Sequence, residues 1–241
     1  MRPFLSFAVL TALALTVAPA SADEPEKPTQ FTADAAYVQT GGNTDVMTLS
    51  GSEKLEHKRG PWLFTQDAAA VWGETEGVEN AGRYRFGLRA DYALNSRLSI
   101  YGLGLWQRNT FAGISRQFNE GAGVSFKAIV PKPHQLDLEA GLGLVQRRTT
   151  AALEEDFATA RLAVLYRYYW SDKAYLEAFG GETINLEDSE DRDTEGRFAL
   201  VAPLTSGVAM RIGYDLYHRN RPQPGFEKLD TTFSAGLQVS Y

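Results

Sequence analysis

The histidines are the first residues to test for catalytic chemistry, because the chain has only three, His57, His134 and His218, and no cysteine. His57 and His134 lie beside short polar turns, whereas His218 alternates with the apolar residues that precede it. A histidine that acts as a catalytic base needs a nucleophile within hydrogen-bond reach, here on an adjacent strand. The expected neighbours offer Thr231 and Thr194 but no serine. We therefore interpret His218 as a polar residue at the border of an apolar face, and the sequence predicts no catalytic residues.

An acidic run near position 190 is a second candidate site. It places Glu187, Asp188, Glu190, Asp191 and Asp193 around Arg192. Carboxylate-rich clusters can bind Ca²⁺, but this run lacks the glycine and the alternating acidic pattern of a calcium loop. We interpret it as a solvated loop, and we predict neither a metal nor a cofactor.

Charged residues also recur at every second position of several segments. In RYRFGLRADYAL (83–94), arginines and an aspartate alternate with apolar residues. This alternation predicts a β-strand with one polar and one apolar face, and it recurs near positions 140, 165 and 213. The polar-face residues predicted in this way are Arg83, Arg85, Arg89, Asp91, Asp137, Glu139, Arg161, Arg167, Arg211 and Asp215.

Turn residues divide the chain into strands of roughly 10 to 13 residues. Tight turns are expected at 58–61, 95–97, 131–134, 171–173 and 204–207. Longer polar loops are expected at 40–45, 73–82, 109–117, 148–156, 185–193 and 220–228. Short and long connections alternate along the chain, which predicts about 12 antiparallel strands and two unlike rims.

The tryptophans indicate which way the apolar face points. Trp62, Trp72, Trp106 and Trp170 fall at or near predicted strand ends, and the first two share one face of one strand. Their spacing corresponds to roughly 33 Å of strand, or roughly 23 Å of height at a tilt of about 45°. This height matches the apolar band of an outer-membrane barrel, where amphipathic rings mark both interfaces. The sequence therefore predicts an all-β fold, a transmembrane antiparallel up-and-down β-barrel with its charged face toward the lumen.

The charged face allows two interpretations. Rows of arginine attract anions and bias a pore, whereas arginines and carboxylates that pair across a narrow lumen hold a structural barrel together. The bore of a barrel with about 12 strands lies between that of an 8-stranded barrel, which side chains fill, and that of a 16-stranded porin, which is open. Size alone does not decide between the two.

The first 22 residues have the features of a signal peptide, with a cation at Arg2, an apolar run at 4–17 and the small residues Ala20-Ser21-Ala22. We expect 23–30 to be a flexible leader and 31–241 to be the outer-membrane barrel. An exported chain without cysteine has no disulfide framework. A formal net charge of −6 argues against nucleic acid as a partner.

Several stretches together resemble one family. They are TGGNTDVMTLSG (40–51), RYRFGLRADYALNSRLSIYGLG (83–104), FAGI (111–114), LDLEAGLGL (136–144) and EKLDTTFSAGLQVSY (227–241). The chain is thereby similar to the salt-induced outer-membrane proteins, the domain-of-unknown-function grouping numbered 481. The resemblance implies a Gram-negative outer-membrane β-barrel, and it supplies no catalytic residues. The last strand, which ends on Tyr241, resembles the C-terminal signal recognised by the barrel-assembly machinery.

These observations favour a non-enzymatic outer-membrane barrel. It is expected to be either a narrow, porin-like channel for small anionic solutes or a structural barrel connected with salt stress, with outer-membrane lipid and lipopolysaccharide as its surroundings. Two alternatives remain: a lipid-modifying enzyme that uses His218, and a soluble periplasmic barrel that binds an apolar ligand.

Overall fold

The computed structural model describes residues 28–41, 46–75 and 78–241. The expected signal peptide (1–22) and residues 23–27 of the expected leader lie outside the described residues. The first strand already begins at Thr29, inside the range expected for the leader.

Twelve β-strands and one short 3-10 helix, η1, make up this part of the chain. The strands are β1 (Thr29–Gly41), β2 (Val46–Arg59), β3 (Trp62–Thr75), β4 (Val78–Ala93), β5 (Leu98–Asn109), β6 (Ile114–Ile129), β7 (His134–Thr149), β8 (Glu154–Tyr169), β9 (Tyr175–Asn185), β10 (Arg192–Pro203), β11 (Val208–Arg219) and β12 (Leu229–Ser240), with η1 (Thr110–Ala112) between β5 and β6.

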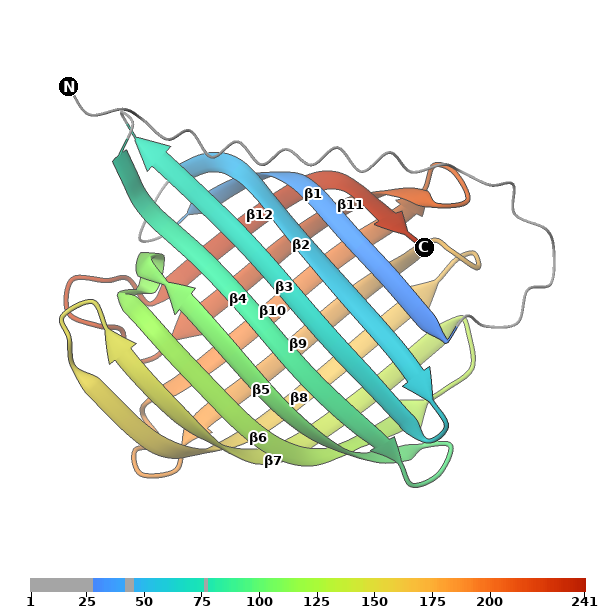
Figure 1. Ribbon diagram of the computed structural model, residues 1–241, viewed down its shortest axis with the longest axis horizontal. Coiled ribbons are helices and arrows are strands. Elements are labelled where there is room, and N and C mark those ends of the chain that lie inside the picture. Colours follow the sequence, from blue (N-terminus) through green and yellow to red (C-terminus); the bar gives the residue numbers. More distant parts are fainter. Residues whose placement is uncertain (1–27, 42–45, 76–77) are drawn as a thin grey trace.

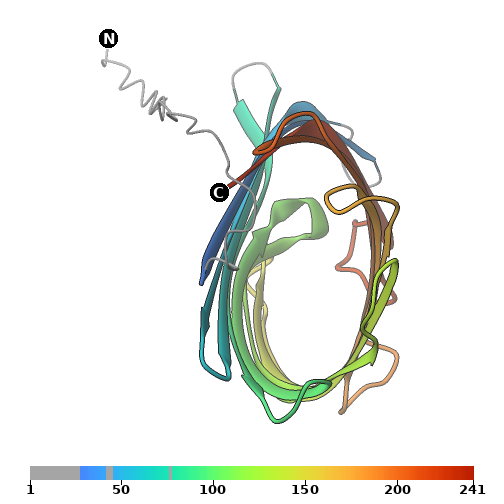
Figure 2. The same cartoon turned by 90° about the vertical axis from the view of Figure 1, so that its right-hand side faces the viewer.

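Each strand pairs antiparallel with its neighbours in the chain, and β1 pairs with β12 to close the sheet into a barrel (Figures 1 and 2). The closing register runs from Thr32 opposite Ser240 to Gly41 opposite Thr231. The short turns gather at one end of the barrel, on the right in Figure 1, and the longer connections at the other. The predicted fold class, an antiparallel up-and-down barrel of about 12 strands, is confirmed.

The two faces of the wall differ in chemistry. On β4 the apolar series points outward, and Phe86 and Leu88 remain 42% and 54% exposed. The alternate residues, Arg85 and Arg89, point into the barrel and make ion pairs there. A soluble barrel that binds an apolar ligand is expected to have the opposite arrangement, with its apolar face inward. No helix in the described part of the chain is long and apolar enough to cross a membrane.

A patch of glycines on β6 and β7 makes room for a large ring on the inner wall. Tyr101 of β5 is 5% exposed and lies over Gly123 and Gly141. A Cβ atom added at either glycine would lie 2.6 Å from the Tyr101 hydroxyl. The Arg89 guanidinium stacks on the other side of the ring, 4.1 Å from its centroid. The glycines thus let a tyrosine lie flat against the wall and support a charged residue of the lumen.

The connections at the longer-loop end turn inward. Figure 2 shows the β5–β6 connection, which contains η1, inside the outline of the wall. The Thr110 hydroxyl of η1 accepts a hydrogen bond from the Gly82 backbone N–H of β4 at 2.8 Å and donates one to the Gly82 carbonyl at 3.1 Å. Phe226 of the β11–β12 loop lies against Gly113, whose φ of +70° and close ring contact both require glycine. Two loops from different parts of the circumference therefore meet at this mouth.

Candidate functional site: the charged lumen

The inner face of the barrel carries the charged residues that alternate along the strands. The strand registers place the following residues on this face: Arg83, Arg85, Arg89, Asp91, Asp137, Glu139, Arg161, Arg167, Arg211 and Asp215. The structure brings some of these together as ion pairs and leaves others apart.

One group of paired charges lies on β4, β7 and β8. Arg89 binds Asp91 and Glu139, each at 2.8 Å, and Arg161 binds the other oxygen of Glu139 at 2.8 Å. Glu139 of β7 therefore links an arginine of β4 to an arginine of β8. These carboxylates neutralise the arginines that the sequence singled out as an anion-attracting row.

Two further arginines have their own carboxylates. Arg167 of β8 binds Glu177 of β9 at 2.7 Å, and Arg85 of β4 lies 3.2 Å from Asp67 of β3. Neither Glu177 nor Asp67 was among the residues predicted from the sequence. The alternation around Glu177 is weak because Phe179 and Gly181 share its face of β9, so its facing could not be assigned before the register was known.

Other lumen arginines face aromatic rings. Arg197 of β10 stacks 4.0 Å from the centroid of Phe179, and Arg83 lies 5.9 Å from the ring of Tyr217. The contact between Arg83 on β4 and Tyr217 on β11 reaches across the barrel, because these strands are far apart in its circumference. Arg197 also interacts electrostatically with Arg85 of the opposite wall. The lumen is therefore narrow enough for charges on facing walls to act on one another.

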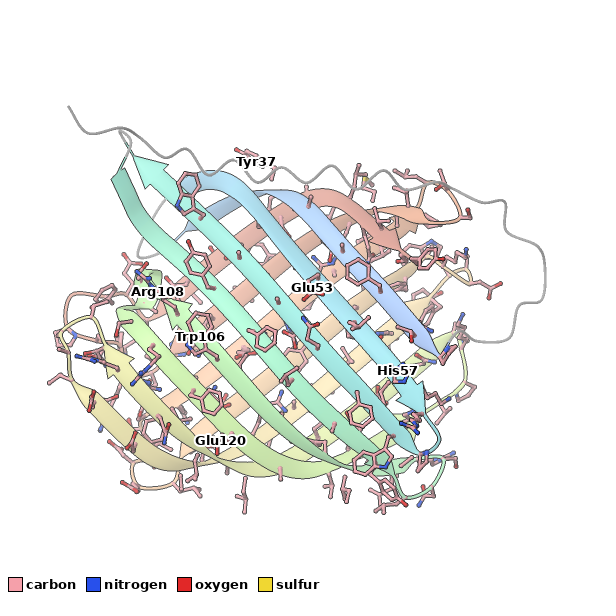
Figure 3. All side chains as sticks on the ribbon, viewed as in Figure 1. Tyr37, Glu53, His57, Trp106, Arg108 and Glu120 are labelled. Atoms are coloured by element: carbon pink, nitrogen blue, oxygen red, sulfur yellow. The ribbon has the colours of Figure 1, made fainter. Side chains whose placement is uncertain are left out.

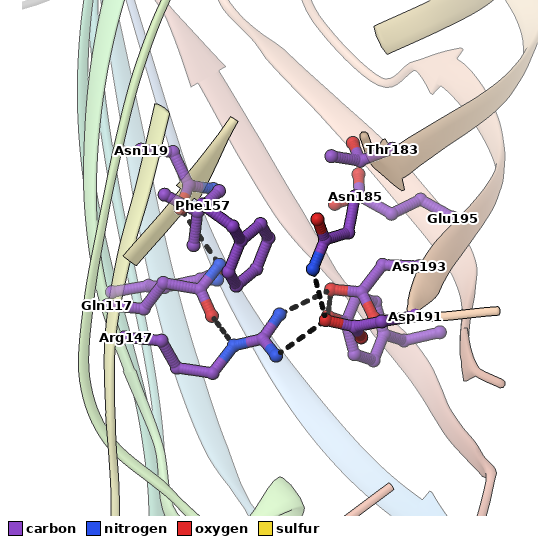
Figure 4. A pocket seen from close by; sticks show the side chains of 12 residues that line it. Gln117, Asn119, Arg147, Phe157, Thr183, Asn185, Asp191, Asp193 and Glu195 are labelled. Atoms are coloured by element: carbon purple, nitrogen blue, oxygen red, sulfur yellow. Dashed lines mark hydrogen bonds and ion pairs between the residues drawn. The ribbon is translucent and has the colours of Figure 1, made fainter. Parts of the chain in front are cut away.

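A second charged cluster, the mouth cluster, lies in the lumen toward the longer loops. It consists of Asp193, Arg219, Tyr217, Arg147, Asp191 and Gln117, and Figure 4 labels four of these, Gln117, Arg147, Asp191 and Asp193. Arg219 binds both oxygens of Asp193, at 2.9 and 3.1 Å, and the Tyr217 hydroxyl donates to Asp193 at 2.7 Å. A carboxylate bound by a bidentate arginine and a phenol is strongly held.

Arg147 joins the other side of the mouth to this carboxylate. Its guanidinium lies 3.5 Å from Asp193 and 3.5 Å from Asp191, and its Nε donates to Gln117 at 3.0 Å. The side chains of Arg147 and Arg219 are only 4% and 3% exposed. The cavity at this point measures about 20 Å³, which is room for about one water molecule.

The mouth cluster corrects part of the sequence interpretation. The acidic run at 187–193 was expected to be solvated, but Asp191 and Asp193 point into the barrel and bind buried arginines. The beginning of the acidic run is more solvated, since Asp188 contacts the exposed Arg221. Arg147 and Arg219 were missed because each adjoins other polar residues, so no alternation marked its facing. In the described residues, no three His, Asp or Glu side chains are grouped so as to hold a metal ion.

Three of the tryptophans lie on the outward face of strands, and Trp170 lies in the turn that follows β8. Trp62, Trp72, Trp106 and Trp170 are 41%, 45%, 37% and 49% exposed. Trp62 and Trp72 lie at opposite ends of β3 on the outward face. In Figure 3, Trp106 lies toward the longer loops and His57 toward the short turns.

Two groups of polar residues interrupt this outer wall. Near its middle, Gln66 of β3 donates to Glu53 of β2, on the outward face (Figure 3 labels Glu53). Close to the loops, His218 lies opposite Thr194 in the ladder. The Thr194 hydroxyl donates to Glu182 at 2.6 Å, so its proton is directed away from His218. Thr231 lies opposite Leu216. This geometry does not make His218 the base for a threonine nucleophile.

A closed 12-stranded barrel with an apolar outer wall and a polar lumen defines the outer-membrane β-barrel class. Within this class, the chain matches the family described as protein of unknown function DUF481 over residues 33–241. The chain belongs to this family, as its sequence motifs indicated. A comparison with curated proteins finds no match.

Solved structures with a similar fold include a porin, a channel and a translocator domain. The NanC porin superposes with a TM-score of 0.60 at 10% identity, covering 86% of this chain and 98% of the porin. An outer-membrane channel from Pseudomonas putida F1 superposes with a TM-score of 0.55 at 9% identity, covering 94% of this chain and 100% of the channel. The translocator domain of the autotransporter NalP from Neisseria meningitidis gives 0.52 at 15% identity, covering 90% of each chain. At these identities the likeness is one of fold.

Proposed function

We propose that the protein is a narrow outer-membrane channel for small polar and ionic solutes, with its tightest point at the mouth cluster. The observation that carries this proposal is the contrast in exposure along the lumen. The side chains of Lys54, Arg85 and Arg89 are 45%, 36% and 24% exposed, whereas those of Arg147 and Arg219 are nearly buried. A lumen that is wet in its middle and constricted near one end has the form of a selective pore rather than of a filled plug.

The charge pattern supports a weak preference for anions. Arg83 and Arg197 lie against the rings of Tyr217 and Phe179, and Arg197 also interacts electrostatically with Glu195, Asp215 and Glu177. Arginines that line a pore favour anions. The preference is expected to be weak because the ion-paired arginines are neutralised, and because Asp137 and Asp215 also face the lumen. We therefore place ion selectivity in Arg83 and Arg197 rather than in the whole arginine row.

The orientation follows the rule for bacterial barrels, which have short periplasmic turns and longer outward loops. The mouth cluster would then lie at the extracellular end, with β1 and β12 beginning and ending at the periplasmic side. Assembly would use the last strand and Tyr241, which follows it and pairs with Phe31 through two backbone hydrogen bonds of 2.9 and 3.0 Å. The NanC porin and the Pseudomonas channel, which share the fold, are consistent with a transport role.

Conductance across a planar lipid bilayer tests this proposal. Refolded mature protein should give discrete conductance steps, and a salt gradient should give a reversal potential of anionic sign. Replacing Arg83 and Arg197 together by alanine should reduce or invert that potential. Arg192→Ala is the matched control, because Arg192 points outward at the same end of the barrel. A folded, heat-modifiable barrel that conducts no ions would contradict the channel and favour a structural role for the ion pairs.

A further inference from the structure

Three arginines lie next to one another on the outer wall at the longer-loop end. They are Arg108 of β5, Arg116 of β6 and Arg148 of β7, on three consecutive strands. We refer to them as the arginine cluster. None lines the lumen, since the alternate residues Gln117 and Arg147 point inward and belong to the mouth cluster.

The register sets the height of this cluster on the wall. Arg116 lies directly opposite Arg148. Trp106 lies directly opposite Phe118, one outward position nearer the middle of the membrane. Two residues of strand tilted by about 45° correspond to about 5 Å of height. The arginine cluster therefore lies just beyond the aromatic belt, at the level where lipid headgroups begin (Figure 3 labels Arg108 and Trp106).

The cluster is short of counter-charge within the protein. Arg148 lies 3.8 Å from Glu154, but both side chains are well exposed, at 49% and 68%, and such a pair contributes little. Among the described residues, Arg108 and Arg116 have no carboxylate within ion-pair distance. Like charges directly opposite each other in a ladder destabilise it, so the Arg116–Arg148 pair calls for an external anion.

We propose that the arginine cluster binds the phosphate groups of lipopolysaccharide in the outer leaflet. The argument rests on the proposed outer-membrane location with the longer loops outward, not on conduction. Guanidinium groups bind phosphate oxygens in bidentate fashion, and this wall presents three of them on adjacent strands. The aromatic residues below it, Trp106 and Phe118, would contact the first part of the acyl chains.

Binding of purified lipopolysaccharide to the refolded barrel in detergent tests this inference. We expect the intact lipid to bind and to raise the temperature of the heat-induced mobility shift, and its chemically dephosphorylated form to do so much less. Each of Arg108→Gln and Arg116→Gln should weaken binding about fivefold, and the double variant should weaken it further. Arg116→Lys should retain most of the binding. Arg192→Gln, which removes an outward arginine near Glu182 (3.8 Å) at the same rim, should change little.

Three results would overturn the inference. Equal binding of intact and dephosphorylated lipid would show that phosphate is not recognised. Equal binding by the double variant and the Arg192→Gln control would show that the cluster is not the site. Equal protection by inorganic phosphate alone would assign the cluster to a free anion. Because binding is measured without conductance, a silent pore would leave this test intact.

Discussion

Asp193 is the residue on which most contacts of the mouth converge, since Arg219, Tyr217 and Arg147 all bind its carboxylate. Removing one member of a buried ion pair costs about 3–5 kcal/mol, because the remaining charge stays buried without a partner. We therefore expect Asp193→Ala to lower the free energy of unfolding by about this amount. Urea unfolding in lipid vesicles measures it.

The matched control for this prediction is Asp188→Ala, at the other end of the same acidic run. Asp188 contacts Arg221, and both are well exposed. Exposed pairs contribute about 0–1 kcal/mol. If the two variants were equally stable, the mouth cluster would have no special energetic weight.

The pair of Glu53 and Gln66 on the outer wall gives a second prediction at this scale. Removing one polar partner leaves the other unsatisfied, whereas replacing both by apolar residues is neutral or favourable. We expect Gln66→Leu to destabilise the barrel by about 1–3 kcal/mol. The double change to leucine at both positions should restore or exceed the original stability in the same unfolding assay. A double variant less stable than the single one would indicate that the pair contacts something other than lipid.

At the scale of elements, the glycine patch of β6 and β7 determines where Tyr101 lies. A side chain at Gly141 would meet both the Tyr101 hydroxyl and the backbone oxygen of Ala122, at 2.6 and 2.8 Å. Gly141→Val should therefore destabilise the barrel by about 1–3 kcal/mol through overpacking, and should displace the ring that supports Arg89. Gly102→Val, on the outward face with open space around it, should be tolerated. Tyrosine fluorescence and urea unfolding report both effects.

The contact between the β11–β12 loop and the β5–β6 connection makes a prediction about the pore. Phe226→Ala removes the ring that lies against Gly113, so the two loops should separate more readily. We expect a larger single-channel conductance, with stability changed only slightly. Leu153→Ala on the neighbouring β7–β8 connection is the control, because Leu153 is 54% exposed. An unchanged conductance in Phe226→Ala would mean that the narrowest point lies deeper, at the mouth cluster alone.

The strands themselves were largely predictable, but their outer ends were not. The predicted loops at 73–82 and 109–117 are mostly strand, since β4 begins at Val78 and β6 at Ile114. Beyond the apolar band, outward residues such as Arg116 need not be apolar. Alternation of polarity therefore disappears there even though the backbone stays extended. The tight turns were easier to locate because proline, glycine and asparagine mark them chemically.

For the molecule as a whole, sequence periodicity predicts the class of fold and the facing of most charges, but not which charges meet. Whether Glu139 binds Arg89 or Arg161 depends on the strand registers, and in fact it binds both. Cross-lumen contacts such as Arg83 with Tyr217 depend in addition on how the sheet closes. These contacts depend on residues far apart in the sequence that the closed barrel brings together, so no local sequence pattern predicts them.

The barrel is closed between β1 and β12 by hydrogen bonds alone. Every other neighbouring pair of strands is joined by a connection in the chain, but β1 and β12 meet only through their ladder. Bringing them together closes the longest loop in the protein, so its entropy cost is the highest of any pairing. An unfinished barrel has two unpaired edges, which are prone to pair with other chains. This seam is therefore expected to be the last part of the wall to form and the first to open during unfolding.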